Sequence, residues 1–266
     1  MHWLLQHNLS TDEQRQRFVD ALDSLKPLGA TWSFIKLIPF AGDVEPDDDY
    51  TGKKVFALGS TSLIAGAKKR NWNPGVIYNP ETFRHEAWIK GFGKENMLNG
   101  DGVVQRFGDV RPVSGTHVFI RPCEDLKAFS GQVIDADQLR DWVARTIEGE
   151  VSSRCLQLNT DTMVVVAEPK FLYREWRFFV VGGEVVAGSQ YRDVYGQKRE
   201  DPNVDPDVQR FTQRMVDKWK PADCFVLDIA ATAEGLKVIE VNCFNGSGVY
   251  ACNIEAAFAA VERFYA

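Results

Sequence analysis

The sequence predicts a small α/β layer followed by a larger α+β region. In the first hundred or so residues, short apolar stretches alternate with segments of helical periodicity, which is typical of a parallel sheet with helices. Beyond Gly100, a turn that contains Gly and Asp leads mainly into strands and ends this alternation. We therefore expect one domain at residues 1–109 and a second at 110–266, with lobes at about 110–167 and 168–266.

The elements of the α/β layer follow one another in a regular order. Short apolar stretches predict four strands, at residues 3–7, 32–39, 54–58 and 75–78. Helical periodicity predicts helices at residues 11–25 and 62–69, and Ser10 or Thr11 supplies an N-cap for the first helix. The acidic, proline-containing stretch at 42–49 is expected to be a surface loop.

The second region is richer in strands than in helices. Strands are predicted at residues 103–107, 116–120, 163–167, 175–181, 184–191, 225–230 and 236–242. Amphipathic periodicity predicts helices at residues 137–148, 205–219 and 254–265. Gly182 and Gly183 separate two of the strands and predict a two-residue hairpin turn.

Composition and charge exclude several classes of protein. The net charge of −6 does not favour a general nucleic-acid binder, which would normally be basic. Five scattered cysteines without CxxC spacing are typical of reduced thiols, and the four histidines show no ligand spacing. No apolar run reaches the length of a membrane span, so we expect a soluble, cytoplasmic protein. The oligomeric state stays open, a homodimer included.

The most informative segment is the predicted hairpin at residues 225–242. A three-residue turn at 233–235, centred on Glu234, would place Asp228 directly opposite Glu240. Asn242 follows two residues later and shares the same face, because successive side chains of a strand point to opposite faces.

Two carboxylates that face each other repel, and a divalent cation would remove that repulsion. Asp228, Glu240 and Asn242 offer hard oxygen ligands, and Mg²⁺ usually takes one or two carboxylates and leaves positions for substrate phosphates. The alternative is a solvated hairpin face on which the asparagine starts a turn. A slip of one residue in the pairing would also separate the two carboxylates.

Basic residues after an apolar strand predict contacts with phosphates. Arg121 directly follows the strand HVFI, and Lys127 precedes Ser130 and Gly131, whose backbone could close over a phosphate. A guanidinium can grip a phosphate with two hydrogen bonds, whereas a loop lysine offers a movable point charge. The alternative for each basic residue is a solvated surface charge.

A second pair of arginines lies in the segment EWRFFVVGGEVVAGSQYR. Glu175 and Arg177 share one face of the first strand, and Trp176, Phe178 and Val180 share the other face and can pack into the core. Arg192 ends the second strand, and two arginines on one ribbon suit the stabilisation of charge on a transferring phosphoryl group. The alternative is a cross-strand ion pair with Glu175 or Glu184.

The apolar stretch MVVVAEPKF is a weaker indication of a nucleotide site. Its strand ends at Ala167 and Glu168, where the main chain near Ala167 could read an adenine edge and Glu168 could hold the ribose. Any buried strand that enters a turn would look similar.

Together these segments resemble the ATP-grasp superfamily, and within it the clade named for two arginines and a lysine. The resemblance covers about the last 155 residues and depends on FIRPCEDLKAFSG, EWRFFVVGGEVVAGSQYR, and LDIA combined with VIEVNCFNGSGVY. Arg121, Lys127 and Arg177 would represent the clade's three residues. Arginine at 121 departs from the lysine of many relatives, and a long glycine-rich phosphate loop is missing from this sequence.

The resemblance implies an ATP-grasp fold, with two α+β lobes that clamp ATP behind a small α/β domain. It implies that Arg121 and Lys127 contact the phosphates, that Ala167, Glu168 and Glu175 help to bind ATP, and that Asp228, Glu240 and Asn242 bind one or two Mg²⁺ ions. The usual reaction of the family forms an amide from a carboxylate and an amine through an acylphosphate, with release of ADP and phosphate. Arg177, Lys127 and Arg192 would be the catalytic residues, and Arg192 would also help to bind the acid.

Two other functions stay open from the sequence. The same nucleotide site could pass a phosphoryl group to a hydroxyl, or the chain could bind Mg-ATP without turnover. The partners of a ligase would be a carboxylate and an amine, each either a small molecule or a peptide, and the sequence identifies neither.

Overall fold

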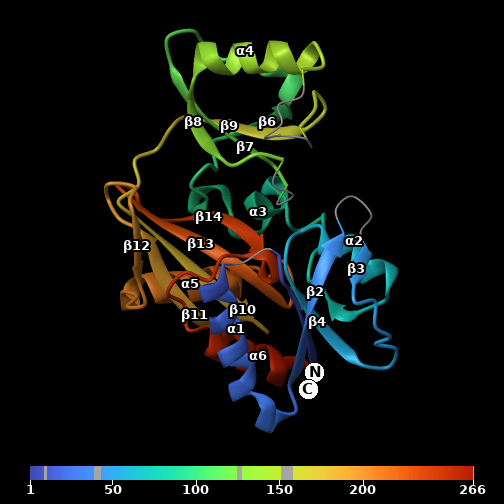
Figure 1. Ribbon diagram of the computed structural model, residues 1–266. Helices are drawn as coiled ribbons and strands as arrows, with labels where there is room; N and C mark the ends of the chain where they lie inside the picture. Colours follow the sequence, from blue (N-terminus) through green and yellow to red (C-terminus); the bar gives the residue numbers. More distant parts are fainter. Residues whose placement is uncertain (9–10, 39–42, 125–127, 151–157, 266) are drawn as a thin grey trace.

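The computed structural model describes residues 1–8, 11–38, 43–124, 128–150 and 158–265, and these residues form three sheets (Figure 1). The first sheet has the order β3-β2-β1-β4-β5, the second β6-β9-β7-β8, and the third β12-β11-β10-β13-β14. The second sheet and its helix α4 lie at the top of the view, above the third sheet. This arrangement confirms the predicted α/β layer followed by α+β structure.

The first sheet is parallel except at one edge. Its parallel strands are β1 (His2–Gln6), β2 (Thr31–Ile38), β4 (Lys54–Leu58) and β5 (Asn73–Gly75). The short β3 (Asp43–Glu45) pairs antiparallel with β2 inside the stretch that was expected to be a loop, so that expectation is wrong in part. The strand predicted at 75–78 is also misplaced, because β5 ends where it should begin.

Two helices and a short 3-10 turn connect these strands. Helix α1 (Asp12–Ser24) begins at the predicted cap, where the Thr11 side chain accepts a hydrogen bond from the Gln14 N–H. The 3-10 helix η1 (Lys26–Leu28) follows α1, and α2 (Leu63–Lys69) lies between β4 and β5.

The second sheet is antiparallel and carries one helix. It consists of β6 (Val103–Arg106), β7 (His117–Pro122), β8 (Gln132–Asp135) and β9 (Met163–Ala167), and α4 (Ala136–Ile147) contributes Leu139 and Val143 to the core on one face. The domain boundaries at 109 and 167 stay predictions. However, β6 precedes residue 110 and pairs with β9, so this sheet begins earlier in the chain than the predicted second domain.

The third sheet forms the centre of the molecule. Its strands are β10 (Arg174–Val181), β11 (Glu184–Arg192), β12 (Lys198–Asp201), β13 (Cys224–Thr232) and β14 (Gly235–Cys243). Helices α3 (His85–Phe92) and α5 (Pro206–Lys218) cover one face, where Trp176, Phe178 and Val180 are buried as the alternation predicts.

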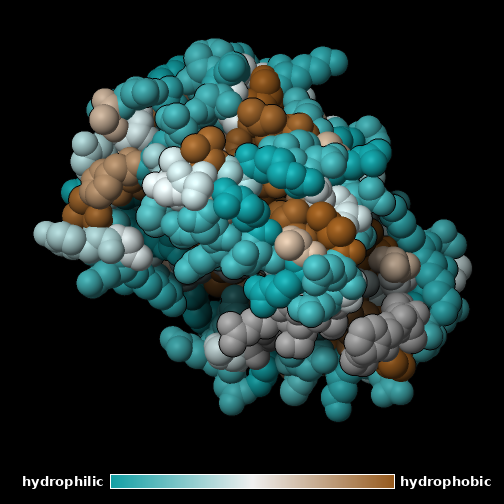
Figure 2. All heavy atoms as spheres, turned by 90° about the horizontal axis from the view of Figure 1, so that it is seen from above, coloured by the Kyte–Doolittle hydropathy of each residue, from teal (hydrophilic) through white to brown (hydrophobic). Residues whose placement is uncertain are grey.

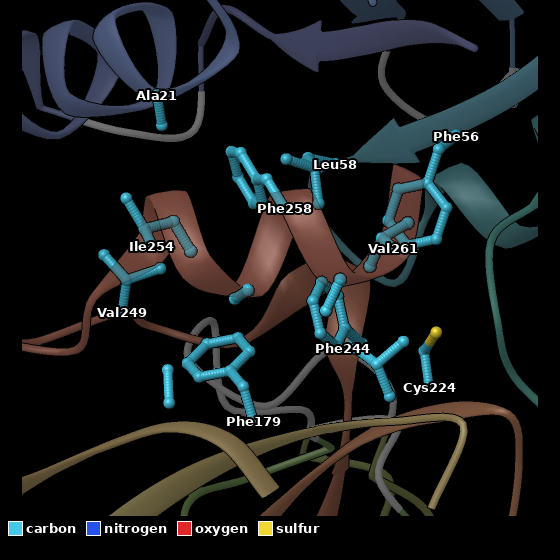
Figure 3. Close-up of a cluster of buried hydrophobic side chains, with 14 of the residues drawn as sticks. Ala21, Phe56, Leu58, Phe179, Cys224, Phe244, Val249, Ile254, Phe258 and Val261 are labelled. Atoms are coloured by element: carbon cyan, nitrogen blue, oxygen red, sulfur yellow. The ribbon is translucent and has the colours of Figure 1, made fainter. Parts of the chain in front are cut away.

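The other face of the third sheet packs on α6 (Ile254–Tyr265). This helix also contacts α1, and its Phe258 lies 4.7 Å from Trp3 between ring centroids, so α6 joins the first sheet to the third. Figure 3 shows Phe179 and Phe244 on the sheet side of α6 and Leu58 on the side of the first sheet. Continuous apolar packing therefore connects the two layers.

Two hairpins determine how the third sheet presents its side chains. Gly182 and Gly183, with φ of 61° and 95°, form the predicted two-residue turn between Val181 and Glu184. The predicted three-residue turn at 233–235 is wrong, because Thr232 pairs directly with Gly235. A bulge at Ile239 then shifts the pairing by one residue, so Asp228 still stands opposite Glu240 as predicted.

Several short elements had no recognised signal in the sequence. They are α3, β3, β8, β12 and the 3-10 helices η1, η2 (Lys94–Asn96), η3 (Phe107–Asp109) and η4 (Phe244–Gly246). Among the described residues no helix is long and apolar enough to cross a membrane. Hydrophilic side chains cover most of the face seen in Figure 2, with apolar residues gathered in a few places. Burial raises the pKa of Cys123 and Cys224 to about 12, as expected for buried thiols.

Candidate functional site

A cavity of about 410 Å³ opens between the second and third sheets. Seven of the predicted site residues line it: Arg121, Glu175, Arg177, Arg192, Asp228, Glu240 and Asn242. Ser130 and Gly131 line it as well. Lys127 lies outside the described residues. The fold therefore brings together groups from β7, β10, β11, β13 and β14 that are up to 121 positions apart in the sequence.

Two arginines neutralise the pair of carboxylates at the base of the cavity. Arg177 of β10 stands opposite Asp228 of β13 and donates from Nε and Nη2 to its two oxygens at 2.8 and 2.7 Å. Arg121 places Nη1 2.8 Å from Oε2 of Glu240. The sequence interpretation assigned the counter-charge to a metal ion alone, whereas here both carboxylates already have a guanidinium partner.

Asn242 completes the cluster. Its Nδ2 donates to Glu240 Oε1 at 3.0 Å and to Asp228 Oδ2 at 3.3 Å. The three side chains form a compact group, as the strand alternation predicts.

The donor set fits a hard cation. Two carboxylates and one amide oxygen are ligands that Mg²⁺ accepts, and a turned Asn242 amide would present its oxygen in place of the nitrogen. Glu240 is partly open to solvent, with 26% of its side chain exposed. Within the described ranges no group of three or more His, Cys, Asp or Glu residues could hold a metal ion, so a site here would need the amide oxygen of Asn242 as its third protein ligand. Asp228, Glu240 and Asn242 would therefore hold the ion.

Burial controls the protonation of this cluster. Asp228 is 1% exposed, and burial raises its pKa to about 6 against the opposing effect of Arg177. For Arg177, burial lowers the pKa, but the charge and hydrogen bonds of Asp228 raise it above its ordinary value. Arg177 is consequently a permanent cation inside the cavity.

A stacked pair of tyrosines holds the other side of Arg177. The rings of Tyr191 and Tyr250 lie 4.8 Å apart at an interplanar angle of 12°, and the guanidinium carbon of Arg177 lies 5.7 and 5.1 Å from their centroids. The Tyr191 hydroxyl donates to Glu175 at 2.7 Å. Sequence reasoning missed both tyrosines, because Tyr191 near the end of β11 resembles a core residue and Tyr250 lies in a turn beyond β14.

The predicted cross-strand alternative is realised for only one of the two arginines. Arg192 stands opposite Glu175 and pairs with it at 3.4 Å. Arg177 pairs with Asp228 on the other neighbouring strand instead. The side chain of Arg192 is more than half exposed at the mouth of the cavity, where it can meet a ligand.

Arg121 rests on helix α3. Its guanidinium carbon lies 4.9 Å from the centroid of the Trp88 ring, a cation–π arrangement, and its Nε donates to the Pro122 carbonyl. His85 of the same helix is buried, and burial followed by the charge of Arg121 lowers its pKa to about 4. His85 is therefore neutral near pH 7.

The two residues predicted to contact adenosine do not line this cavity. Ala167 is buried at the end of β9 and Glu168 is exposed beyond it, and neither is among the described residues that line the cavity. Apolar side chains do line it: Leu98, Phe119, Leu172 and Ile239. These residues form a wall on which a flat ring could pack, so the adenosine roles of Ala167 and Glu168 stay predictions.

The fold and the cavity define an ATP-grasp protein. The structure is similar to D-alanine–D-alanine ligase from Bacillus anthracis complexed with ATP, with a TM-score of 0.59 and 13% identity over 98% of this chain and 91% of that one. It is also similar to a RimK domain ATP-grasp protein from Sphaerobacter thermophilus, with a TM-score of 0.58 and 12% identity over 93% and 92% of the two chains. No curated protein matches the chain.

The family can be stated more closely. A family model for an ATP-grasp domain, that of family 3 in the clade named for two arginines and a lysine, matches residues 65–261. The chain belongs to this family, as its two arginines and its carboxylate hairpin suggested. Membership in an ATP-grasp family implies that the protein binds ATP.

Proposed function

We propose that the protein is an ATP-dependent carboxylate–amine ligase that forms an amide through an acylphosphate. The observation that carries this proposal is the buried cation Arg177, set beside Asp228, Glu240 and Asn242 in a cavity between two antiparallel sheets of an ATP-grasp fold. A fixed cation in a poorly solvated site stabilises the negative charge that develops during phosphoryl transfer.

The proposed reaction has two steps. A carboxylate oxygen of the acid attacks the γ-phosphorus of ATP, and the bond to the bridging oxygen breaks and releases ADP. The amine nitrogen then attacks the carbonyl carbon of the acylphosphate, loses its proton, and expels inorganic phosphate. Neither step needs a nucleophile from the protein, so positioning and charge stabilisation supply the catalysis.

Each side chain has a part in this scheme. Arg177 would stabilise the charge on the moving phosphoryl group, and Arg192 at the mouth of the cavity would bind the acid. Arg121 would exchange Glu240 for a phosphate of ATP, which would free Glu240 for the ion. Mg²⁺ held by Asp228, Glu240 and Asn242 would neutralise phosphate charge.

The main chain after β14 offers one more group. The Gly248 carbonyl accepts a hydrogen bond from Arg177 Nη1 at 3.2 Å. Its N–H has no partner among the residues that the structure describes. A free N–H beside Arg177 suits an oxyanion that forms when the amine attacks.

Hydroxylamine provides a direct test, because it reacts with an acylphosphate and replaces an unknown amine. The protein with ATP, Mg²⁺, hydroxylamine and mixtures of carboxylic acids should release ADP and form a hydroxamate, and Arg177→Ala should abolish both. A mixture of alcohols that yields ADP without any acid would instead show a phosphotransferase. ATP binding without ADP release under any condition would identify a module without turnover.

A further inference from the structure

A second cavity, of about 180 Å³, lies between α1, the first sheet and the start of α6. Its lining is mainly apolar and includes Leu5, Phe18, Leu58, Phe179, Phe244 and Phe258. Figure 3 shows several of these side chains gathered around α6. Gln14 and Arg15 of α1 line the cavity too.

This cavity occupies the place where open α/β sheets usually bind ligands. Gln6 ends β1, and Gly59 directly follows β4, so the cavity lies at the carboxyl ends of these parallel strands. The chain passes from β1 to β2 on one side and later returns to β4 on the other, which makes the gap between β1 and β4 a topological switch point. Crevices at such points are the common ligand sites of this architecture.

The cavity is also adjacent to the proposed reaction site. Arg177 and Phe179 share one face of β10, two residues apart, which separates their Cα atoms by about 7 Å. Arg177 lines the first cavity and Phe179 the second. Gly248 lines the second cavity, and its carbonyl accepts a hydrogen bond from Arg177.

We infer that this cavity binds the side chain of the acid substrate, and that the acid carries a compact apolar group, either a branched aliphatic chain or a phenyl ring. The inference rests on the proposed function. The carboxylate would lie toward Gly248 and Arg177, and the apolar group would fill the space against Phe179. An apolar cavity of about 150 Å³ accommodates benzene, so this volume suits a phenyl or branched group.

Most of the charge and hydrogen-bonding capacity in the lining is already used inside the protein: Arg15 pairs with Asp12 and donates to the His7 carbonyl at 3.0 Å. Gln6 accepts hydrogen bonds from the main chain and side chain of Ser60, and Asn245 donates to the carbonyl of Ala57. A buried charge without a partner is strongly disfavoured. Acids with charged side chains should therefore be rejected.

Binding of free amino acids tests the inference without turnover. Ligand-observed NMR would compare L-leucine and L-phenylalanine with glycine, L-serine and L-aspartate, with and without Mg-ATP. We expect leucine and phenylalanine to bind at least about tenfold more tightly than the other three, because each buried methylene contributes about fourfold.

Gln14→Trp should fill the mouth of the cavity and abolish this preference. Gln16→Trp is the matched control, because Gln16 is exposed on the same helix and does not line the cavity. The inference is supported if leucine and phenylalanine bind the wild type and Gln16→Trp but not Gln14→Trp. It is overturned if aspartate or serine binds as tightly, if Gln14→Trp binds normally, or if none of the acids binds. Thermal stabilisation by Mg-ATP, measured on the same samples, tests the proposed function separately.

Discussion

Arg177 and Asp228 depend on each other more than on any other residue of the site. Asp228 is almost fully buried, and both of its oxygens accept hydrogen bonds from the guanidinium. Removing one partner of such a pair leaves an uncompensated charge in a poorly solvated place. Glu240 differs, because a quarter of its side chain is open to water.

The difference in burial between Asp228 and Glu240 predicts that two similar substitutions lower the free energy of unfolding by different amounts. Asp228→Asn should lower the free energy of unfolding by about 3–5 kcal/mol, because Arg177 then stays buried without a counter-charge. Glu240→Gln should lower the free energy of unfolding by about 1 kcal/mol, since water can reach the place where Arg121 meets the side chain of residue 240. Urea denaturation at pH 7 measures both, and equal losses would contradict the difference in burial. Glu240→Gln is consequently the better variant for testing the metal site.

At the scale of elements, the 3-10 helix η4 and the residues after it join two layers. The Gly59 N–H donates to the Asn245 carbonyl, and Asn245 also accepts from Ile77. A Cβ on Gly246 would lie 2.9 Å from the Gly59 carbonyl oxygen, closer than side-chain atoms normally come. The segment between the two cavities is therefore held tightly against the carboxyl end of β4.

Gly246→Ala should lower the free energy of unfolding by about 1–3 kcal/mol, because the backbone of η4 or of β4 must shift to admit the methyl group. Gly248→Ala is a matched control two residues away, where a Cβ would meet its nearest atoms at 3.6 and 3.9 Å. Thermal or urea melts of both variants measure the effect. A loss as large in Gly248→Ala would refute the close approach as its cause.

Strand ends and hairpins follow local patterns, and the sequence predicted them well. Strands β4 and β9 begin and end at the predicted residues, and the Gly182–Gly183 turn is as expected. The hairpin of β13 and β14 shows the limit of such reasoning. Its predicted turn was wrong and the bulge at Ile239 unforeseen, and the two deviations offset each other, so that the expected pair formed.

At the scale of the whole molecule, the first cavity opens between two distinct sheets. Arg121 comes from the second sheet, and its partner Glu240 comes from the third. A ligand that replaces this ion pair with contacts to both sheets would stabilise their arrangement. Ligand binding should therefore appear in the stability of the whole protein.

ATP and Mg²⁺ together should stabilise the wild type by about 2.7 kcal/mol at a hundredfold excess over the dissociation constant. ATP without Mg²⁺ should have a smaller effect, and Glu240→Gln should lose the difference while it stays folded. Thermal melting with ATP, Mg²⁺, both and neither measures these shifts. Equal shifts with and without Mg²⁺ would refute the metal assignment, and no shift at all would refute the nucleotide site.

Most of the longer strands, the alternation along them, and the common face of Asp228, Glu240 and Asn242 could be predicted from the sequence, because strand periodicity is a local property with a period of two residues. The short strands β3, β8 and β12 could not. Which charges meet depends on how distant segments pack together. The pairing of Arg177 with Asp228, the contact of Arg121 with Trp88, and the tyrosine stack all join segments far apart in the chain. Side-chain periodicity carries no information about such contacts. They arise from the pairing of β10 with β13, from the packing of α3, and from the position of the segment after β14.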